Sequence, residues 1–170
     1  MKKKTHRVSN RKIAYLITAM IVLINFITII VPLFFLYTFP DSKLTFIFFS
    51  YPNNLISILG AFFFIYFVIT GVFHFTLRVD SYIIEVKSKR TILGFFIKKN
   101  NFIEMPKTSV LKYAFYKRYF TFNTTLMVKV KASNKKTIAK RFHLSFLSKK
   151  KKEFIVQVLD KIIQKNALDG

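Results

Sequence analysis

Two long stretches without charged side chains dominate the first half of the chain. Residues 13–39 contain no charge over 27 positions, and residues 55–77 contain none over 23. Helices of these lengths, rising ~1.5 Å per residue, are long enough to cross the ~30 Å hydrocarbon core of a bilayer. The pattern therefore predicts two transmembrane helices. Pro32 leaves the carbonyl of Thr28 without its helical donor, so we expect a kink or an early end near this position.

The residues before the first apolar stretch are strongly basic, since residues 1–12 carry six Lys or Arg and no acidic side chain. Such a tail resembles the start of a signal peptide. The apolar stretch is too long for one, however, and no small-x-small cleavage site follows it. We therefore expect a basic tail, residues 1–12, followed by an uncleaved transmembrane helix.

Charge is distributed unevenly around the two predicted helices. The net charge is +6 before the first, 0 in the connecting loop, residues 40–54, and +16 from Arg78 onward. Because cytoplasmic segments carry the Lys and Arg excess, both termini should be cytoplasmic and the loop extracytoplasmic. We expect its apolar part, Leu44–Phe49, to lie in the membrane interface. The prediction is a multi-pass membrane protein with both termini in the cytoplasm.

After Leu77 the apolar positions alternate with polar ones, which is typical of half-buried strands. Residues 82–87 alternate clearly, and we expect a turn at 88–90 and a second strand at 91–97. A further strand at 102–105 should lie at an edge or end at Pro106, because proline donates no hydrogen bond.

The last third of the chain predicts a hairpin and a helix. Strands at 126–131 and 137–144 flank a polar turn, and Ser148 is placed to cap a C-terminal helix. The expected inward residues are Leu126, Val128, Val130, Ile138, Phe142 and Leu144 on the strands, and Phe154, Ile155, Val158, Leu159, Ile162 and Ile163 on the helix. Residues 78–170 thus predict a cytoplasmic domain of antiparallel strands closed by an amphipathic helix.

One part of this domain resembles a known family. Gly94-Phe95-Phe96 with Lys98-Lys99, followed by Ile103-Glu104-Met105-Pro106 and Val110, is similar to a stretch in bacterial pleckstrin-homology-like membrane proteins of the YdbT type. The family has an Ile-Pro-x-Ser-x-Ile segment at this place. Met105 stands where the family has the first Ile, and Thr108-Ser109 shifts the serine hydroxyl by about one residue. The resemblance implies a seven-strand α+β or all-β sandwich or barrel capped by the helix, and no shared catalytic residue.

Composition narrows the function classes. The chain has 29 Lys plus Arg against 7 Asp plus Glu, a net charge of +22, and is 52% hydrophobic, which excludes a disordered chain and argues against a purely soluble protein. AT-rich codon usage produces a similar excess of Lys and Phe, so the charge alone does not indicate a ligand. The chain has no Cys, and therefore no disulfide and no thiolate nucleophile.

Residues for catalysis do not converge along the sequence. Asp80 and Glu85 point to opposite faces of their predicted strand, and His6, His74 and His143 are dispersed without a second ligand nearby. No glycine-rich phosphate loop is present. We therefore predict a protein that is not an enzyme and binds neither a metal nor a cofactor.

Basic residues provide the first set of candidate contacts. Those expected to meet anionic lipid headgroups are Lys149, Lys150, Lys151, Lys152, Lys112, Lys117 and Arg118. The four consecutive lysines stand at a helix N-terminus, where positive charge is mildly unfavourable, which favours a use outside the helix. Simple solvation of these charges is the alternative.

Aromatic residues and one amide provide the second set. Six aromatic side chains lie between positions 112 and 122, more than one strand face can bury. We expect Tyr113, Tyr116 and Tyr119 to contact a partner protein or the membrane, and Asn25 to bond across the helix pair or to another subunit. A nucleic-acid partner is not expected, because the chain is membrane-bound and lacks an RNA-binding signature.

Taken together, the sequence predicts a non-enzymatic membrane protein whose cytoplasmic domain docks on anionic lipid or on membrane partners, including a second copy of itself. The alternative is a small accessory or regulatory subunit of a larger membrane complex.

Overall fold

The computed structural model describes residues 5–50, 53–91, 101–132 and 136–168. The chain divides into two compact units. The helical unit comprises Leu16–Gly71, and the sheet unit combines Met1–Tyr15 with Val72–Gly170. Each unit is described by itself.

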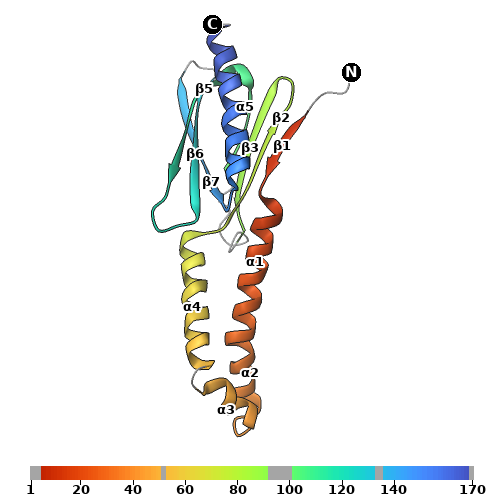
Figure 1. Cartoon of the computed structure of the whole chain (residues 1–170), viewed down its shortest axis with the longest axis vertical. Coiled ribbons are helices and arrows are strands. Elements are labelled where there is room, and N and C mark those ends of the chain that lie inside the picture. The colour runs from red at the N-terminus through yellow and green to blue at the C-terminus, as the bar shows by residue number, and fades with distance from the viewer. Residues whose placement is uncertain (1–4, 51–52, 92–100, 133–135, 169–170) are drawn as a thin grey trace. The chain divides into compact units, whose positions relative to one another are not determined.

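A long helix in three sections begins just before the helical unit and forms its first part (Figure 1). These are α1 (Arg11–Asn25), a π-helical section η1 (Phe26–Ile30) and α2 (Val31–Thr38). A short helix α3 (Lys43–Phe49), capped by Ser42, follows and leads to α4 (Asn53–Thr70). The helix predicted over residues 13–39 is confirmed, and the apolar part of the loop is helical.

Pro32 does not end the first helix. Instead the backbone widens into a π turn directly before it, with the N–H of Val31 bonded to the carbonyl of Phe26. The carbonyl of Thr28 accepts a hydrogen bond from Ser57 Oγ at 2.7 Å, which replaces the donor that proline lacks. Gly60 also lies close to Thr28, since a Cβ at this glycine would stand 2.8 Å from the threonine Oγ1. The helices thus contact at the site the proline perturbs.

The second predicted helix, residues 55–77, extends beyond the point where the helix ends in the structure. Helix α4 ends at Thr70, and the next residue, Gly71, has a φ of 75°, the left-handed conformation that commonly terminates helices. Strand β2 (Phe73–Val79) follows almost at once. The uncharged stretch therefore merges a helix and a buried strand, which hydropathy alone cannot separate.

The sheet unit contains a four-stranded antiparallel sheet in the order β1-β2-β3-β4. Besides β2 it comprises β1 (His6–Ser9), β3 (Ile83–Arg90) and β4 (Asn101–Pro106). The turn predicted at 88–90 is wrong, because β3 continues through it. Most of the strand predicted at 91–97, and the residues Gly94 to Lys99 that carry the family resemblance, lie outside the described residues. Strand β4 is at an edge and ends at Pro106, as predicted.

The predicted domain boundaries change at the N-terminus. Residues 6–9 are not a free tail but strand β1, paired with β2 so that Val8 lies opposite Leu77. The predicted boundary at residue 78 also cuts through β2. A fragment beginning there would lack one strand and most of a second. The basic stretch conceals β1 because three of its four side chains are polar or charged.

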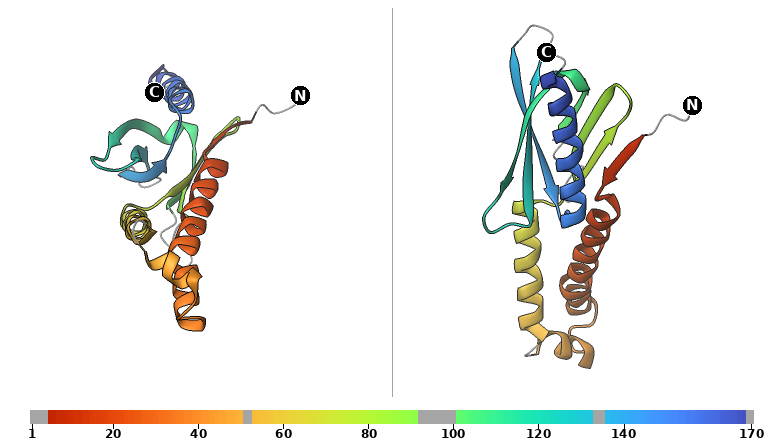
Figure 2. Two further views of the ribbon diagram at one scale, coloured as in Figure 1. Left: turned by 60° about the horizontal axis from the view of Figure 1, so that its bottom comes forward. Right: turned by 45° about the horizontal axis from the view of Figure 1, so that its top comes forward.

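The second sheet has the order β5-β6-β7 (Figure 2). It comprises β5 (Val110–Lys117), preceded by a 3₁₀ turn η2 (Lys107–Ser109), β6 (Asn123–Lys131) and β7 (Thr137–Ser145). The predicted inward positions on β6, and Phe142 and Leu144 on β7, are buried. Ile138 is 42% exposed, contrary to prediction, because the first residues of β7 extend beyond the core.

Helix α5 (Lys149–Leu168) completes one hydrophobic core with both sheets. Its Ile155 and Leu159 are fully buried in the same cluster as Phe75 from the first sheet and Phe142 from the second. The described residues thus confirm antiparallel sheets with a C-terminal helix. Their seven strands form two separate sheets and not a closed barrel.

Candidate functional site

One end of the sheet unit carries most of the predicted contact residues. We call it the junction end, because the chain passes from β1 into α1 there after Asn10 and enters β2 there at Phe73. Asn10 is 1% exposed and bonds to two segments. Its Nδ2 donates to the carbonyls of Phe73, at 3.0 Å, and Ser145, at 2.6 Å, while its Oδ1 accepts from the N–H of Phe75 at 2.6 Å.

Ser145 extends this hydrogen-bonded cluster to the second sheet. Its Oγ accepts from the N–H of Phe73 at 2.8 Å and donates to Asn123 Oδ1. Asn123 begins β6 and Ser145 ends β7 shortly before α5. The turn between β5 and β6 and the start of α5 therefore both belong to the junction end. The sequence does not predict this cluster, because isolated Asn and Ser residues carry no periodic signal.

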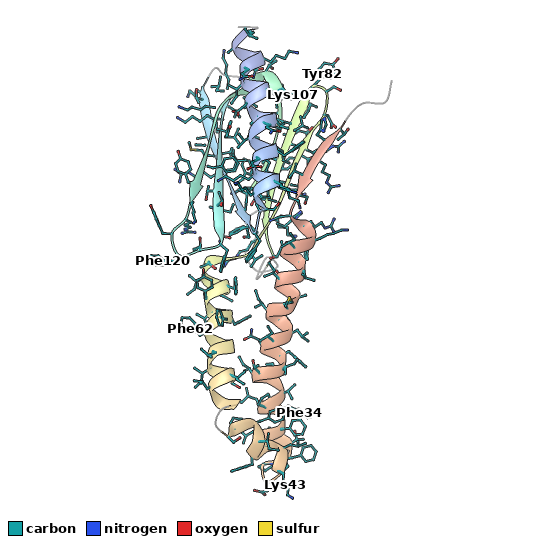
Figure 3. All side chains as sticks on the ribbon, in the orientation of Figure 1. Phe34, Lys43, Phe62, Tyr82, Lys107 and Phe120 are labelled. Atoms are coloured by element: carbon teal, nitrogen blue, oxygen red, sulfur yellow. The ribbon has the colours of Figure 1, made fainter. Side chains whose placement is uncertain are left out.

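The turn between β5 and β6 exposes three aromatic rings. Tyr119, Phe120 and Phe122 are 86%, 96% and 62% exposed, and Phe122 stacks on Phe146 with the ring centroids 5.3 Å apart. A bond from the N–H of Arg118 to the carbonyl of Asn123 closes the turn. Figure 3 shows Phe120 at the opposite end of the sheet unit from Tyr82 and Lys107. The rings thus form an exposed aromatic tip at the junction end.

The four lysines that begin α5 lie at this same end. Lys151 Nζ donates to the carbonyl of Ser9 at 2.7 Å, and Lys152 Nζ lies 5.1 Å from the centre of the Phe115 ring. Lys149 and Lys150 are exposed. Lys151 and Lys152 therefore help to fix α5 on the sheets, whereas Lys149 and Lys150 face solvent.

The structure separates the predicted contact residues into groups. Lys117, Arg118 and Tyr119 are at the junction end with the four lysines of α5, whereas Lys112 lies towards the other end of β5. Tyr116 is 53% exposed near the turn. Tyr113 lies within the domain, where its hydroxyl donates to Asp160 Oδ1 on α5 at 2.7 Å. Burial, with this hydrogen bond and the carboxylate charge, raises the pKa of Tyr113 to about 12.

His74 is on β2 beside the junction end and not in a helix as predicted. Its Nε2 is 3.0 Å from Thr76 Oγ1, and its ring packs against Tyr15. Burial lowers the pKa of His74, and the positive charges of Arg11, Lys87, Arg7 and Lys89 lower it further. The positive charges around His74 thus disfavour a further positive charge on its ring.

Asn25, the predicted interhelical contact, bonds within its own helix. Its Nδ2 donates to the carbonyl of Ile21 at 2.8 Å, while its Oδ1 is buried and has no hydrogen-bond donor among the described residues. The amide therefore has unused acceptor capacity.

Comparisons with known proteins identify no relative. No protein-family model matches the chain, and no curated protein and no solved structure matches it. Among the described residues, the helix from Arg11 to Thr38 is long and apolar enough to cross a membrane, and the apolar helix Leu55–Thr70 is shorter. The site is accordingly interpreted from its own chemistry.

Proposed function

We propose that the chain is a two-span protein of a bacterial inner membrane whose sheet unit is a non-enzymatic module that docks on the anionic cytoplasmic leaflet. The observation that carries this proposal is the pairing of β1 with β2. These strands precede and follow the helical unit, so both ends of that unit are on one side of any membrane it enters. The chain must then cross an even number of times.

Helix α4 supports the second crossing. It has 18 residues and would rise ~27 Å, close to the thickness of the hydrocarbon core. The loop between the helices carries only Asp41 and Lys43, whereas the sequences on either side have net charges of +6 and +16. The asymmetry favours a cytoplasmic location for the sheet unit and for both termini.

The junction end is the part of the sheet unit suited to docking. Helix α1 begins directly after Asn10, and only two residues separate α4 from β2, so chain connectivity keeps this end near the headgroups. Exposed aromatic rings beside basic side chains suit the interface between lipid and water, where the rings leave water and the charges meet phosphates. Two sheets followed by a helix also support the pleckstrin-homology-like fold implied by the resemblance.

A fluorescent probe tests the docking. The chain contains no cysteine, so Tyr119→Cys and Tyr82→Cys each create one labelling site, at the aromatic tip and at the opposite end of the unit. In nanodiscs of the full chain, an environment-sensitive dye at position 119 should shift to the blue with phosphatidylglycerol but not with phosphatidylcholine, and high salt should reverse the shift. The dye at position 82 should not respond. Equal spectra in both lipids at position 119 would contradict docking.

An accessory subunit of a larger membrane complex is the second candidate. It is favoured by Asn25, whose buried Oδ1 could accept a hydrogen bond from a neighbouring helix. Purification in mild detergent followed by mass measurement separates the two functions. One stoichiometric partner protein supports the subunit, and the chain alone supports lipid docking.

A further inference from the structure

A groove opens between the start of the chain and the start of α5, entirely within the sheet unit. Its walls come from β1, the first residues of α1 and the first turns of α5, and its volume is about 640 Å³. This volume is typical of cavities that hold a small molecule or part of a lipid. The groove is not predictable from the sequence, because its two sides are more than 130 residues apart.

The groove has an unusual charge. Five of its lining side chains are cations: Arg7, Arg11, Lys12, Lys150 and Lys151. Among the described residues that line it, none is acidic. Five like charges around one hollow repel one another unless an anion lies between them, and the N-terminus of α5 adds its own positive dipole end.

The remaining walls are mostly apolar and also include Ser9 and Asn10. Val8, Ile13 and Phe154 line the groove together with the aliphatic stems of the basic side chains. A free inorganic anion would leave this apolar surface unused, whereas a phospholipid offers a phosphate and hydrocarbon in one molecule. Because α1 begins in the groove wall, a lipid headgroup reaches it wherever that helix enters a bilayer.

We infer that this groove binds one anionic phospholipid, with the lipid phosphate among the five cations and the upper part of an acyl chain against Ile13 and Phe154. The inference rests on the proposed membrane location. It differs from docking in kind, because it requires one bound lipid at defined residues and not a diffuse attraction to the surface. Lys151 is already bonded to the Ser9 carbonyl, so Arg7 and Arg11, which present planar guanidinium groups, should contribute most.

Native mass spectrometry of the full chain in detergent provides the test. Titration with phosphatidylglycerol should give one saturable adduct per chain, and phosphatidylcholine with the same acyl chains should give none at equal concentration. The double variant Arg7→Gln/Arg11→Gln should weaken the adduct at least about tenfold. A second variant, Lys12→Gln/Lys150→Gln, should also weaken the phosphatidylglycerol adduct. It provides the test if the first variant does not fold.

The matched control removes the same charge elsewhere. Lys129→Gln/Lys140→Gln changes two exposed lysines on β6 and β7, outside the groove, and should alter binding less than about twofold. Glycerol 3-phosphate has the phosphate without acyl chains and should not compete at equal concentration. Competition by it, adducts of equal strength with both lipids, or equal losses in groove and control variants would each overturn the inference.

The outcome is separable from that of docking. A groove-dependent adduct with an unresponsive probe at position 119 would support the lipid site and contradict docking of the aromatic tip. A responsive probe without any saturable adduct would support docking and overturn the lipid site.

Discussion

The two units of this chain use the same residue types in opposite ways. In the sheet unit the side chains of Phe75 and Phe142 are completely buried, whereas in the helical unit Phe34 and Phe62 are 58% and 66% exposed (Figure 3). The helical unit has only two charged side chains, and the sheet unit has all the others. The sheet unit thus buries its rings in a core, whereas the helical unit exposes an apolar surface of the kind that suits hydrocarbon.

The units also satisfy their polar groups differently. In the sheet unit, Asn10 and Ser145 bond across distant strands. In the helical unit, Thr28 and Thr70 each donate to the carbonyl four residues earlier in the same helix, whereas Ser57 bonds across to the carbonyl of Thr28, which Pro32 leaves without its helical donor. Local bonding is what a helix needs where no water is present, because each segment must then satisfy its own polar groups.

The largest effect on stability should come from replacing a buried phenylalanine of the sheet unit by alanine, with an exposed phenylalanine of the helical unit as the comparison. Phe142→Ala removes a fully buried ring and should lower the free energy of unfolding of the sheet unit by ~3–5 kcal/mol. Phe62→Ala removes an exposed ring and should change this free energy of unfolding by less than ~0.5 kcal/mol. Thermal unfolding of the full chain in detergent, followed by near-ultraviolet circular dichroism, measures both. Similar losses would mean that the two units do not differ in packing.

A somewhat smaller effect is expected at the junction end. Asn10→Ala deletes three hydrogen bonds and leaves the N–H of Phe75 buried without its acceptor, so the sheet unit should lose ~2–4 kcal/mol. Asn101→Ala deletes one exposed bond, to the carbonyl of Arg141, and should cost ~0.5–1 kcal/mol. Chemical denaturation compares the variants. Equal costs would show that the buried cluster adds no more than a surface bond.

The hydrogen bond between Tyr113 and Asp160 should contribute less to the free energy of unfolding, ~1 kcal/mol. The variant Tyr113→Phe, which removes the hydroxyl, measures this contribution. Its pH dependence is more diagnostic. Because the pKa is raised in the folded protein to about 12, stability is complete below the ordinary value of 10 and falls as the pH rises from there. The Phe variant should lack this decrease. If the stability of the variant decreased at alkaline pH as much as that of the unchanged protein, the decrease would come from other groups.

The smallest effect concerns His74, whose pKa is lowered by burial and by nearby positive charges. The unfolded chain then binds a proton more readily than the folded one below pH 6.5, so stability should fall as the pH decreases from that value. His74→Gln should flatten this slope. Unfolding midpoints between pH 7.5 and 5 test it, and an identical slope in the variant would contradict the role of the histidine.

Much of the fold could be predicted because strong periodicity marks its elements. Residues 126–131 alternate regularly, and 149–168 repeat at helical spacing, so their strand and helix were identified. The predicted inward faces are correct except at Phe154, which is 36% exposed. Prediction failed where a helix and a strand follow each other in the sequence with similar hydropathy. Helix α4 and strand β2 as far as Leu77 lie in a single uncharged stretch, and the helix ends at Gly71, whose φ is 75°.

The candidate site was less predictable than the fold. The lysines of α5 and the aromatic residues near 119 were identified from composition, yet their presence at one end depends on Asn10, Asn123 and Ser145. Strand β1 was concealed in a basic tail, since pairing with β2 stabilises it and its own residues show little strand pattern. Long-range pairing of this kind is not visible in a local pattern.

The pairing of β1 with β2 is itself open to a chemical test. Arg7 and Arg78 lie opposite each other in the register, so Arg7→Cys/Arg78→Cys should form a disulfide on mild oxidation of the full chain. Arg7→Cys/Glu85→Cys is the control, because Glu85 is one strand further away, beyond the reach of a disulfide. Crosslinking of the control pair alone would contradict the strand order.

The central claim, that the helical unit crosses the membrane as a pair and returns the chain to one side, is tested most directly by labelling single cysteines in intact cells. Thr5→Cys, Asp41→Cys and Lys140→Cys each place one thiol in the cysteine-free chain, before, within and after the helical unit. A membrane-impermeant maleimide added outside should label position 41 alone, and positions 5 and 140 should react only after the cells are opened. Labelling of positions 5 and 140 from opposite sides, or of position 41 from the same side as both, would contradict the claim.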